Sequence, residues 1–395
     1  MGCARENFER GDFDSSPPSF TMAGLVKTMQ ALQLTEYRKL QLVDLPVPAL
    51  APDEVLIRVA ACGICGSDVH GYDGSTGRRI PPLVMGHEAA GVIAAVGTDV
   101  LIYAIGERVT FDSTISCGTC RFCKTGAINL CDHREVRGVS CGDYRRNGAF
   151  AEYVVVPARI VYRLPDALGF AEAAMIEAVS VALHAVHLAA PEQGSSALVV
   201  GAGMIGLLIL QSLRVAGCEK ILVTDIDRGR LELAKKLGAE EVLHVDAATT
   251  SEKIAEQVRA FTGGHGADVV LEAVGSPATV RTAIASARKG ATVTLVGNLA
   301  PEVALPLQVV VTRQLRLQGS CASSGEYPEA IELMASKAID VTPMLSAVAP
   351  LTEGPRWFER LYAHEANLMK VVLTPGPVAC TRKRRSRHWR SPCST

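Results

Sequence analysis

A glycine-rich segment in the second half of the chain constrains the fold most strongly. It follows a short apolar run, Ser196–Val200, and leads into an apolar stretch with helical character, Leu207–Ala216. A Gly-x-Gly-x-x-Gly pattern alone is weak evidence, but its place between a buried strand and a helix is typical of a dinucleotide-binding unit. The glycines let the backbone approach a pyrophosphate, which rests on the helix N-terminus. The expected cofactor contacts in this segment are Gly201, Gly203, Met204, Ile205 and Gly206.

A second predicted strand, Lys220–Thr224, ends at an acidic residue. Asp225 is expected to accept hydrogen bonds from the hydroxyl groups of the adenosine ribose. A carboxylate at this position repels a 2′-phosphate, so the sequence favours NAD over NADP. Arg228 and Arg230 lie nearby and reduce that preference, and Arg230 is itself an expected cofactor contact.

The alternation of strands and helices continues after this unit. Helices are predicted at Leu231–Leu237, Ile254–Phe261 and Ala278–Ala287, and strands at Glu241–Val245, Asp268–Glu272 and Ala291–Val296. Strands that alternate with helices indicate a parallel, doubly wound sheet with right-handed crossovers. Because 395 residues are too many for one ordinary core, a second domain is expected before this one.

The two ends of the chain differ from its body. Beyond Lys370 every charged residue is basic, and we interpret residues 376–395 as a disordered basic tail. Nucleic-acid binding by this tail is the alternative, and the near-zero net charge of −1 argues neither for nor against it. Residues 1–28 are interpreted as a disordered N-terminal extension. No apolar run approaches the roughly 20 residues that span a bilayer, and no secretory signal is visible, so a cytoplasmic protein without a membrane partner is expected.

Four cysteines lie within one short stretch. The spacing of Cys117, Cys120, Cys123 and Cys131 can close a tetrahedron of thiolates around one zinc ion, with no position left for a substrate. An iron–sulfur cluster or a redox-active pair are the alternatives, but the spacing does not match the common ferredoxin patterns. A structural zinc site that holds a loop in place is therefore predicted.

A different set of ligand types occurs earlier in the chain. Cys65 is followed some twenty residues later by the segment Gly86-His87-Glu88, which together offer a thiolate, an imidazole and a carboxylate. Those are the ligand types of a zinc ion that keeps one coordination position open. Such an ion acts as a Lewis acid and lowers the pKa of a bound hydroxyl group.

These motifs, in this order, resemble the zinc-containing medium-chain alcohol dehydrogenases over roughly residues 29–375. The resemblance rests on Gly63–Asp68, Gly86–Gly91, the four-cysteine stretch, Gly148–Tyr153 and the glycine-rich segment. Within the family the chain is most similar to the polyol branch of sorbitol, L-iditol and galactitol-phosphate dehydrogenases. The segment Ile176–Val181 points there, although Ala178 stands where polyol enzymes usually have proline.

The resemblance implies a GroES-like β-rich catalytic domain that holds both zinc ions, at 29–185 and completed by 320–375. A Rossmann domain that binds NAD would occupy 186–319. It also implies a homo-oligomer, a dimer or a tetramer. The implied reaction transfers hydride to NAD from a secondary alcohol, namely a polyol, a sugar alcohol or a sugar phosphate. Dehydrogenation of threonine or a small diol is the enzymatic alternative, and a catalytically idle zinc protein is the other.

The resemblance assigns the zinc ligands of the open site. Cys65 and His87 bind the metal, and Glu88 is either a ligand or a neighbour of the ligands. Glu177 binds zinc directly or through its water, or else caps the start of a helix. Asp68 would orient the imidazole of His87.

Two further residues are implied in proton transfer. Ser67 would hydrogen-bond the substrate hydroxyl, and His70 would pass the proton toward solvent, because histidine titrates near neutral pH. An ordinary surface position is the alternative for His70.

Overall fold

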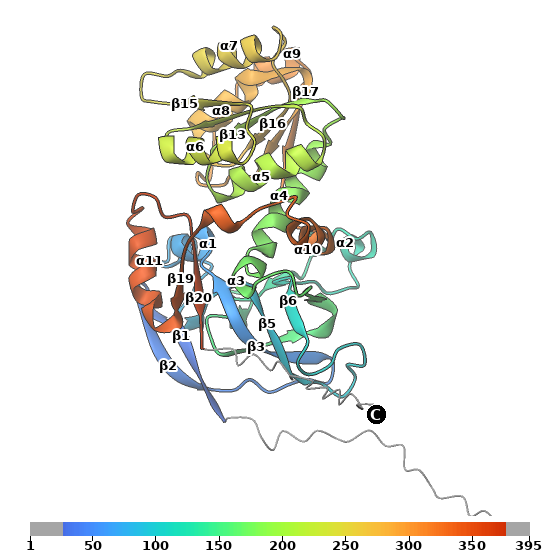
Figure 1. Cartoon of the computed structure of the whole chain (residues 1–395), viewed down its shortest axis with the longest axis vertical. Coiled ribbons are helices and arrows are strands. Elements are labelled where there is room, and N and C mark those ends of the chain that lie inside the picture. The colour runs from blue at the N-terminus through green and yellow to red at the C-terminus, as the bar shows by residue number, and fades with distance from the viewer. Residues whose placement is uncertain (1–26, 377–395) are drawn as a thin grey trace, which may run out of the picture.

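The computed structural model describes residues 27–376. The predicted disordered extension and basic tail therefore lie outside the described residues, apart from their innermost positions. The first described strand, β1, begins at Thr28, one residue before the predicted start of the catalytic domain. The described chain forms two lobes, with a parallel sheet in one and mostly antiparallel strands in the other (Figure 1).

The larger sheet of the first lobe joins strands from both ends of the described chain. Its order is β12-β6-β5-β3-β20-β19, and β11 pairs with β3. The strands are β3 (Glu54–Gly63), β5 (Glu88–Val96), β6 (Arg108–Phe111), β11 (Tyr153–Pro157), β12 (Val161–Arg163), β19 (Leu345–Pro350) and β20 (Lys370–Thr374). Because β20 runs antiparallel to β3, with Leu373 opposite Cys62, the chain returns after the second lobe to complete the first.

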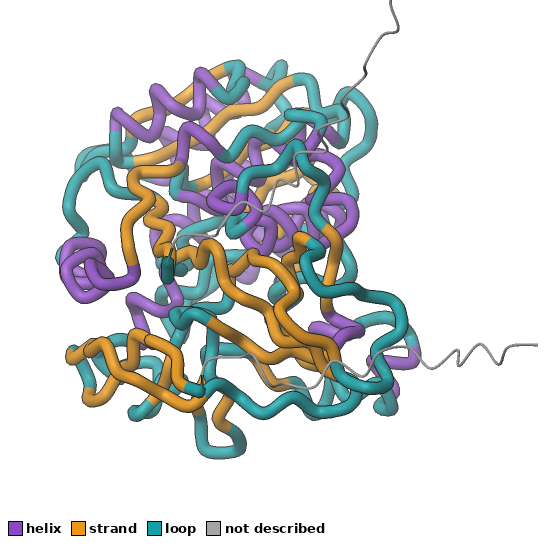
Figure 2. The backbone as a smooth tube through the Cα atoms, turned by 60° about the horizontal axis from the view of Figure 1, so that its bottom comes forward, coloured by secondary structure: helices purple, strands orange, loops and turns teal. Residues whose placement is uncertain are grey.

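Smaller elements surround that sheet. The strands β1 (Thr28–Glu36), β2 (Lys39–Pro46) and β4 (Leu83–Val84) form a three-stranded sheet. Two small two-stranded sheets pair β7 (Thr114–Ile115) with β8 (Glu135–Val136) and β9 (Val139–Ser140) with β10 (Arg145–Arg146). The short helices are α1 (Gly66–Gly71), α2 (Arg121–Lys124), α3 (Phe170–Ala173) and α11 (Gly354–Tyr362). Figure 2 shows most strands of this lobe gathered away from the helix-rich lobe.

The second lobe contains a six-stranded parallel sheet of order β15-β14-β13-β16-β17-β18. Its strands are β13 (Ser196–Val200), β14 (Lys220–Asp225), β15 (Glu241–His244), β16 (Ala267–Glu272), β17 (Ala287–Leu295) and β18 (Arg316–Gly319). Its helices are α5 (Met204–Val215), α6 (Arg228–Lys236), α7 (Ser251–Phe261), α8 (Pro277–Ser286) and α9 (Leu307–Thr312). This order is that of the Rossmann fold, so the predicted doubly wound sheet is confirmed.

Side chains that alternate along β13 explain why both faces of this sheet are covered. Leu198 and Val200 pack in a cluster with residues of α7 and α8, whereas Ala197 and Val199 pack in a cluster with residues of α5 and α6. A strand buried on both faces needs apolar residues at consecutive positions, which is the pattern of Ser196–Val200. The exact domain limits at 185/186 and 319/320 stay a prediction.

Three helices of this lobe begin earlier than their apolar periodicity predicts. α6 and α7 each start three residues ahead of the predicted position and α8 starts one residue ahead, because a polar side chain caps the first turn. Asp227 accepts a hydrogen bond from a backbone N–H of α6 at 3.1 Å, and Thr250 and Ser276 do the same for α7 and α8 at 3.3 Å. Such a cap satisfies a backbone donor that has no partner within the helix.

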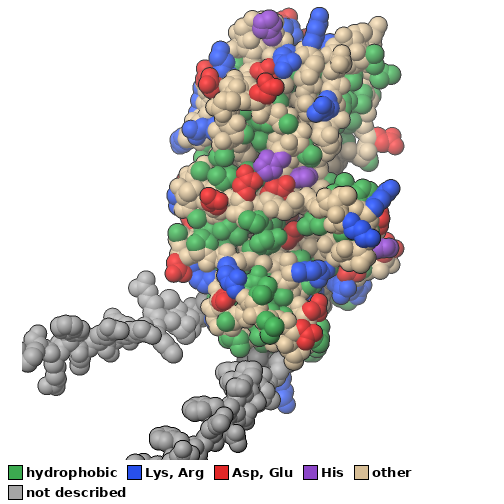
Figure 3. All heavy atoms as spheres, turned by 90° about the vertical axis from the view of Figure 1, so that its right-hand side faces the viewer, with side chains coloured by type: hydrophobic (Ala, Val, Ile, Leu, Met, Phe, Trp, Pro, Cys, Tyr) green, Lys and Arg blue, Asp and Glu red, His purple; other side chains and the backbone are tan. Residues whose placement is uncertain are grey.

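Between the lobes, the helices α4 (Ile176–Ala189) and α10 (Tyr327–Ala335) meet through charged side chains. His184 Nδ1 lies 2.7 Å from Glu326 Oε1, and His187 Nε2 lies 3.3 Å from Glu329 Oε2. Figure 3 shows histidine and acidic side chains side by side at the waist of the molecule. This contact joins the helix that carries Glu177 to the segment that returns from the second lobe.

Candidate functional site

Strand β3 and helix α1 position the first predicted zinc ligand. β3 ends at Gly63, and Cys65 is the N-cap residue of α1 in extended conformation. A carboxylate oxygen of Asp68, in the first turn of α1, accepts a hydrogen bond from the Cys65 backbone N–H at 3.4 Å. The Cys65 thiol therefore lies where the strand meets the helix.

The other two donors come from the start of the neighbouring strand. Glu88 is the first residue of β5 and lies opposite Gly63 of β3, with His87 just before it. One atom each from Cys65, His87 and Glu88 lie within 4.8 Å of one another, and both His87 and Glu88 are buried. A Cβ atom on Gly63 would come 2.3 Å from Glu88 Oε2, so only glycine leaves room for this carboxylate. The donor set fits zinc with an open position.

A buried ammonium group, which sequence reasoning missed, contacts this donor set. Lys370 Nζ lies 2.5 Å from Glu88 Oε2 and donates to the carbonyl of Ile64 at 3.1 Å. Burial lowers the pKa of Lys370, but the negative charges of Glu88 and Cys65 outweigh it and raise the pKa above its usual value. The only signal for Lys370 in the sequence is a lysine at the start of the apolar strand β20.

Asp68 lies against the imidazole, where the resemblance places it. Asp68 Oδ1 is 3.4 Å from His87 Nδ1, and no hydrogen-bond partner of that nitrogen is found among the described residues. Burial raises the pKa of Asp68, but the adjacent His87 and Arg79 outweigh it and hold the pKa at about 2. Asp68 is therefore an anion that favours a proton on His87 Nδ1 and leaves Nε2 for a metal.

Glu177 lies apart from the three converging donors. It is in the first turn of α4 and half-buried, and it does not belong to the group formed by Cys65, His87 and Glu88. Burial raises its pKa to about 7, and the charges of His87 and Glu88 also act on it. Glu177 is thus within electrostatic range of the site, and its role as a ligand stays a prediction.

Ser67 and His70 share the short helix α1 with Asp68. Both are exposed, whereas Asp68 is fully buried, so α1 turns one face toward the ligands and the other toward solvent. Their roles in proton transfer stay predictions.

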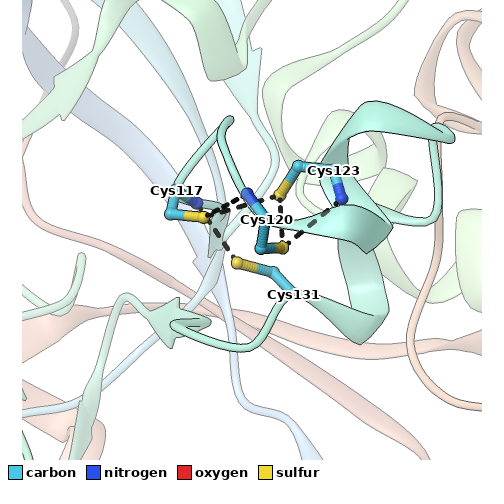
Figure 4. A group of neighbouring side chains, drawn as sticks. All are labelled: Cys117, Cys120, Cys123 and Cys131. Carbon is cyan, nitrogen blue, oxygen red and sulfur yellow. Dashed lines mark hydrogen bonds between the residues drawn. The ribbon is translucent and has the colours of Figure 1, made fainter.

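The four predicted structural ligands converge on one point (Figure 4). The sulfur atoms of Cys117, Cys120, Cys123 and Cys131 all lie within 4.8 Å of one another. The Sγ atom of Cys123 is 3.9 Å from that of Cys117 and 3.5 Å from that of Cys120. A zinc–sulfur distance of about 2.3 Å requires tetrahedral sulfur–sulfur distances of about 3.8 Å. The spacing therefore fits a zinc ion and excludes a disulfide.

Backbone and hydroxyl donors favour the thiolate form at this cluster. The Cys117 sulfur accepts hydrogen bonds from the Thr119 hydroxyl and backbone N–H at 3.5 Å and from the Cys120 N–H at 3.4 Å. These contacts lower the pKa of Cys117 to about 5, with the Thr119 hydroxyl as the largest cause. A thiolate is the form that binds metal.

The glycine-rich turn lies at the carboxyl end of β13, where the strand order of the parallel sheet reverses. Ligands of such sheets bind at this switch point. A Cβ atom on Gly206 would approach the Gly201 carbonyl oxygen to 1.8 Å, whereas one on Gly203, the N-cap of α5, would meet only open space. Gly206 therefore serves close packing of helix on strand, and Gly203 leaves room for a ligand at the helix N-terminus.

Asp225 ends β14 beside that turn. Its Oδ2 accepts from the Ala202 backbone N–H at 2.6 Å, and its Oδ1 accepts from the Asp227 N–H at 2.8 Å. The carboxylate is therefore fixed next to the glycine-rich segment. Arg230 lies nearby in the first turn of α6.

Known proteins identify the family. Residues 51–166 match the alcohol dehydrogenase GroES-like domain, and residues 205–336 match the zinc-binding dehydrogenase domain. The chain is 34% identical to sorbitol dehydrogenase of Bacillus subtilis over 88% of its own length and 98% of that protein. It is also 34% identical to D-arabitol-phosphate dehydrogenase of Enterococcus avium, over 91% and 99% of the two chains.

A solved structure extends the likeness to three dimensions. A zinc-binding dehydrogenase from Sinorhizobium meliloti, bound to NADP, superposes with a TM-score of 0.81 at 32% identity and covers 88% of this chain and 99% of its own. The chain therefore belongs to the zinc-binding dehydrogenase family with an alcohol dehydrogenase GroES-like domain. It is an oxidoreductase that depends on zinc and a nicotinamide dinucleotide, and the predicted fold and family are both confirmed.

Among the described residues, no helix is long and apolar enough to cross a membrane.

Proposed function

We propose that this protein oxidises a secondary alcohol of a polyol, sugar alcohol or sugar phosphate and transfers the hydride to NAD. The observation that carries the proposal is the convergence of Cys65, His87 and Glu88 beside an exposed serine of α1. The names of the relatives, sorbitol dehydrogenase and D-arabitol-phosphate dehydrogenase, support the substrate class.

Cys65 and His87 would hold the catalytic zinc, with Glu88 or Glu177 as the carboxylate beside them. Bound zinc supplies Lewis acidity to an alcohol oxygen, and bound NAD supplies the hydride acceptor. Asp68 keeps the His87 ring in one orientation. When Glu88 does not bind the metal, the buried Lys370 neutralises its carboxylate.

Ser67 and His70 would move the proton that the alcohol loses. The Ser67 hydroxyl accepts it from the substrate hydroxyl, and the His70 imidazole releases it to solvent. The exposure of both side chains on one short helix supports this order. Glu177, with its pKa raised to about 7 mainly by burial, is suited to exchange a proton near neutral pH.

A preference for NAD is part of the proposal. The Asp225 carboxylate is held beside the glycine-rich turn by two backbone N–H groups. A 2′-phosphate would bring negative charge against it, whereas free ribose hydroxyls can donate to it.

The substrate class is tested by following NADH absorbance with purified, zinc-loaded protein. The panel contains sorbitol, xylitol, arabitol and their phosphates, with threonine and 2,3-butanediol as the alternative substrates. Turnover of a polyol or its phosphate with the highest kcat/KM supports the proposal. Faster turnover of threonine or the diol moves the enzyme to the alternative class, and no turnover of any alcohol refutes the proposed activity.

We further propose a homo-oligomer in the cytoplasm. Four large apolar side chains in and before α9 are 44–68% exposed, and contact with a second copy would cover them; they are Leu299, Leu305, Leu307 and Val311. The cysteines of the described part are free thiols, which suits a reducing compartment. Light scattering at micromolar concentration would show a monomer if the proposal of a homo-oligomer is wrong. Cell fractionation tests the cytoplasmic location.

A further inference from the structure

Arg79 is a buried arginine beside the catalytic ligands. It is 4% exposed, although it follows directly on an exposed turn, Ser75–Arg78. A buried guanidinium group costs much desolvation energy unless its donors are satisfied. Its partners therefore indicate what the side chain is for.

Three of its contacts reach two consecutive residues of α1. Arg79 Nε and Nη2 donate to Asp68 Oδ1 at 3.1 and 3.0 Å, and Nη2 also donates to Ser67 Oγ at 3.2 Å. The remaining nitrogen, Nη1, donates to the carbonyl of Arg78 at 3.1 Å. The planar fork of arginine can make these contacts at once, whereas a lysine ammonium acts as a single point charge.

The fold around Arg79 is shaped to hold it there. A Cβ atom on Gly71 would lie 2.3 Å from Arg79 Cγ, so the end of α1 leaves room for this side chain only because residue 71 is glycine. The loop backbone is fixed as well, because Ser140 of β9 donates to the Arg78 carbonyl at 3.3 Å and accepts from Ile80 at 3.1 Å. Arg79 is therefore part of the scaffold and not a mobile pocket residue.

We propose that Arg79 is a positioning residue that couples the zinc ligand His87 to the proton acceptor Ser67. Through Asp68 it fixes the carboxylate that lies 3.4 Å from His87 Nδ1. By donating to Ser67 Oγ, Arg79 also fixes the position of that hydroxyl oxygen. Arg79 does not touch the substrate in this proposal.

The contact with Ser67 has a directional consequence. A hydroxyl group has two acceptor lone pairs and one donor. Because Arg79 donates to Ser67 Oγ, one lone pair is occupied, and the other lone pair and the O–H remain for the substrate and for onward proton transfer. This part of the inference rests on the proposed function, whereas the contact with Asp68 does not.

Two variants and a matched control test the proposal. Arg79→Met removes the charge and the fork and keeps an apolar stem, whereas Arg79→Lys keeps a charge for Asp68 but cannot also hold Ser67. Arg78→Met is the control, because Arg78 is adjacent and exposed. The measurements are zinc content, the visible absorption spectrum of the cobalt-substituted enzyme, kcat, and the KM for NAD.

For Arg79→Met we expect two metal ions per chain, a shifted cobalt spectrum, a kcat at least tenfold lower and a KM for NAD within twofold of wild type. For Arg79→Lys we expect the wild-type cobalt spectrum with a kcat several-fold lower. Arg78→Met should match wild type throughout. If Arg79→Met does not fold, Arg79→Lys decides, and a wild-type kcat in that variant overturns the coupling to Ser67.

A double-mutant cycle with Ser67→Ala tests whether Arg79 affects kcat through Ser67 or independently of it. If Arg79 acts through Ser67, the pair Ser67→Ala and Arg79→Lys should lose no more kcat than Ser67→Ala alone. Additive losses overturn that link. An unshifted cobalt spectrum in Arg79→Met overturns the link to His87. The cobalt spectrum needs no substrate, so it tests the role of Arg79 even if wild type oxidises none of the alcohols. Failure of wild type to oxidise any alcohol would refute the proposed function but not the link between Arg79 and His87.

Discussion

Removal of the buried ammonium group of Lys370 should destabilise the protein far more without zinc than with it. Lys370 and Glu88 form an ion pair at 2.5 Å, and their side chains are only 3% and 1% exposed. Lys370→Met keeps the length of the side chain but leaves the Glu88 carboxylate with no cation beside it. Zinc can replace that cation because Glu88 is within reach of the metal ligands.

The size of the destabilisation follows from the burial of the ion pair between Lys370 and Glu88. Breaking a buried ion pair on one side costs about 3–5 kcal/mol, because an uncompensated charge remains. For chains of this size about 2 °C of melting temperature corresponds to 1 kcal/mol, so the zinc-free variant should melt about 6–10 °C below zinc-free wild type. With zinc bound, the difference should be smaller, since the charge of the metal would compensate Glu88.

An exposed pair of similar length supplies the control. Lys39 lies 2.7 Å from Glu36, but these side chains are 48% and 69% exposed. Lys39→Met should change stability by about 1 kcal/mol or less, with or without zinc. The assay is thermal unfolding of wild type and both variants, in excess zinc and after chelation. Equal losses for Lys370→Met under the two conditions would show that Glu88 does not alternate between lysine and metal, and the reasoning would fail.

Metal analysis of purified protein should give two zinc ions per chain, and Cys120→Ser should lower zinc content and melting temperature together; one ion with full stability would remove the structural site. Asp225→Ala should raise the KM for NAD and improve the relative use of NADP, and a wild type that already prefers NADP contradicts this assignment. Glu177→Gln should lower kcat by ~10² or more while the four-cysteine zinc stays bound, and unchanged turnover would leave Glu177 a helix-start residue. The Glu326 carboxylate, 3.7 Å from His187 Nδ1, is the chief cause that raises the pKa of His187, so the stabilisation by His187 is complete below the unfolded value of about 6.5 and is lost as pH rises through the folded pKa. His187→Gln should therefore lower the melting temperature slightly at pH 6 and not at pH 9. An equal effect at both pH values would show that the stabilisation does not come from the positive charge of His187.

The fold was predictable because its signals are local. The glycine-rich segment and the apolar strand before it mark β13 and α5 within a few residues. The convergence of the donors Cys65, His87 and Glu88, and of the four cysteines, was predictable for the same reason, because each group comes from one or two short motifs. The helix starts were placed too late, since apolar periodicity carries no signal for caps such as Asp227 and Ser276, and the start of β17 was placed four residues too late.

The partners of the site were not predictable, because they depend on contacts distant in sequence. Lys370 lies 282 residues from Glu88, and no motif links them. Arg79 lies only 11 residues from Asp68, but its direction depends on Gly71 and on the pairing of the loop with Ser140. Which way a charged side chain points in a loop is set by the packing around it. Sequence patterns therefore found the two groups of converging donors and missed the charged side chains beside them.

The return of the chain to its first sheet fixes the order in which the protein can be completed during synthesis. The strands of the parallel sheet come from one continuous stretch, 196–319, but α10 belongs to the same core, so this lobe can be complete only after α10 has left the ribosome. The catalytic sheet must wait for β20, and with β20 comes the ammonium group that neutralises Glu88. A nascent chain that stops before Lys370 therefore contains every strand of the parallel sheet but lacks the cation beside Glu88.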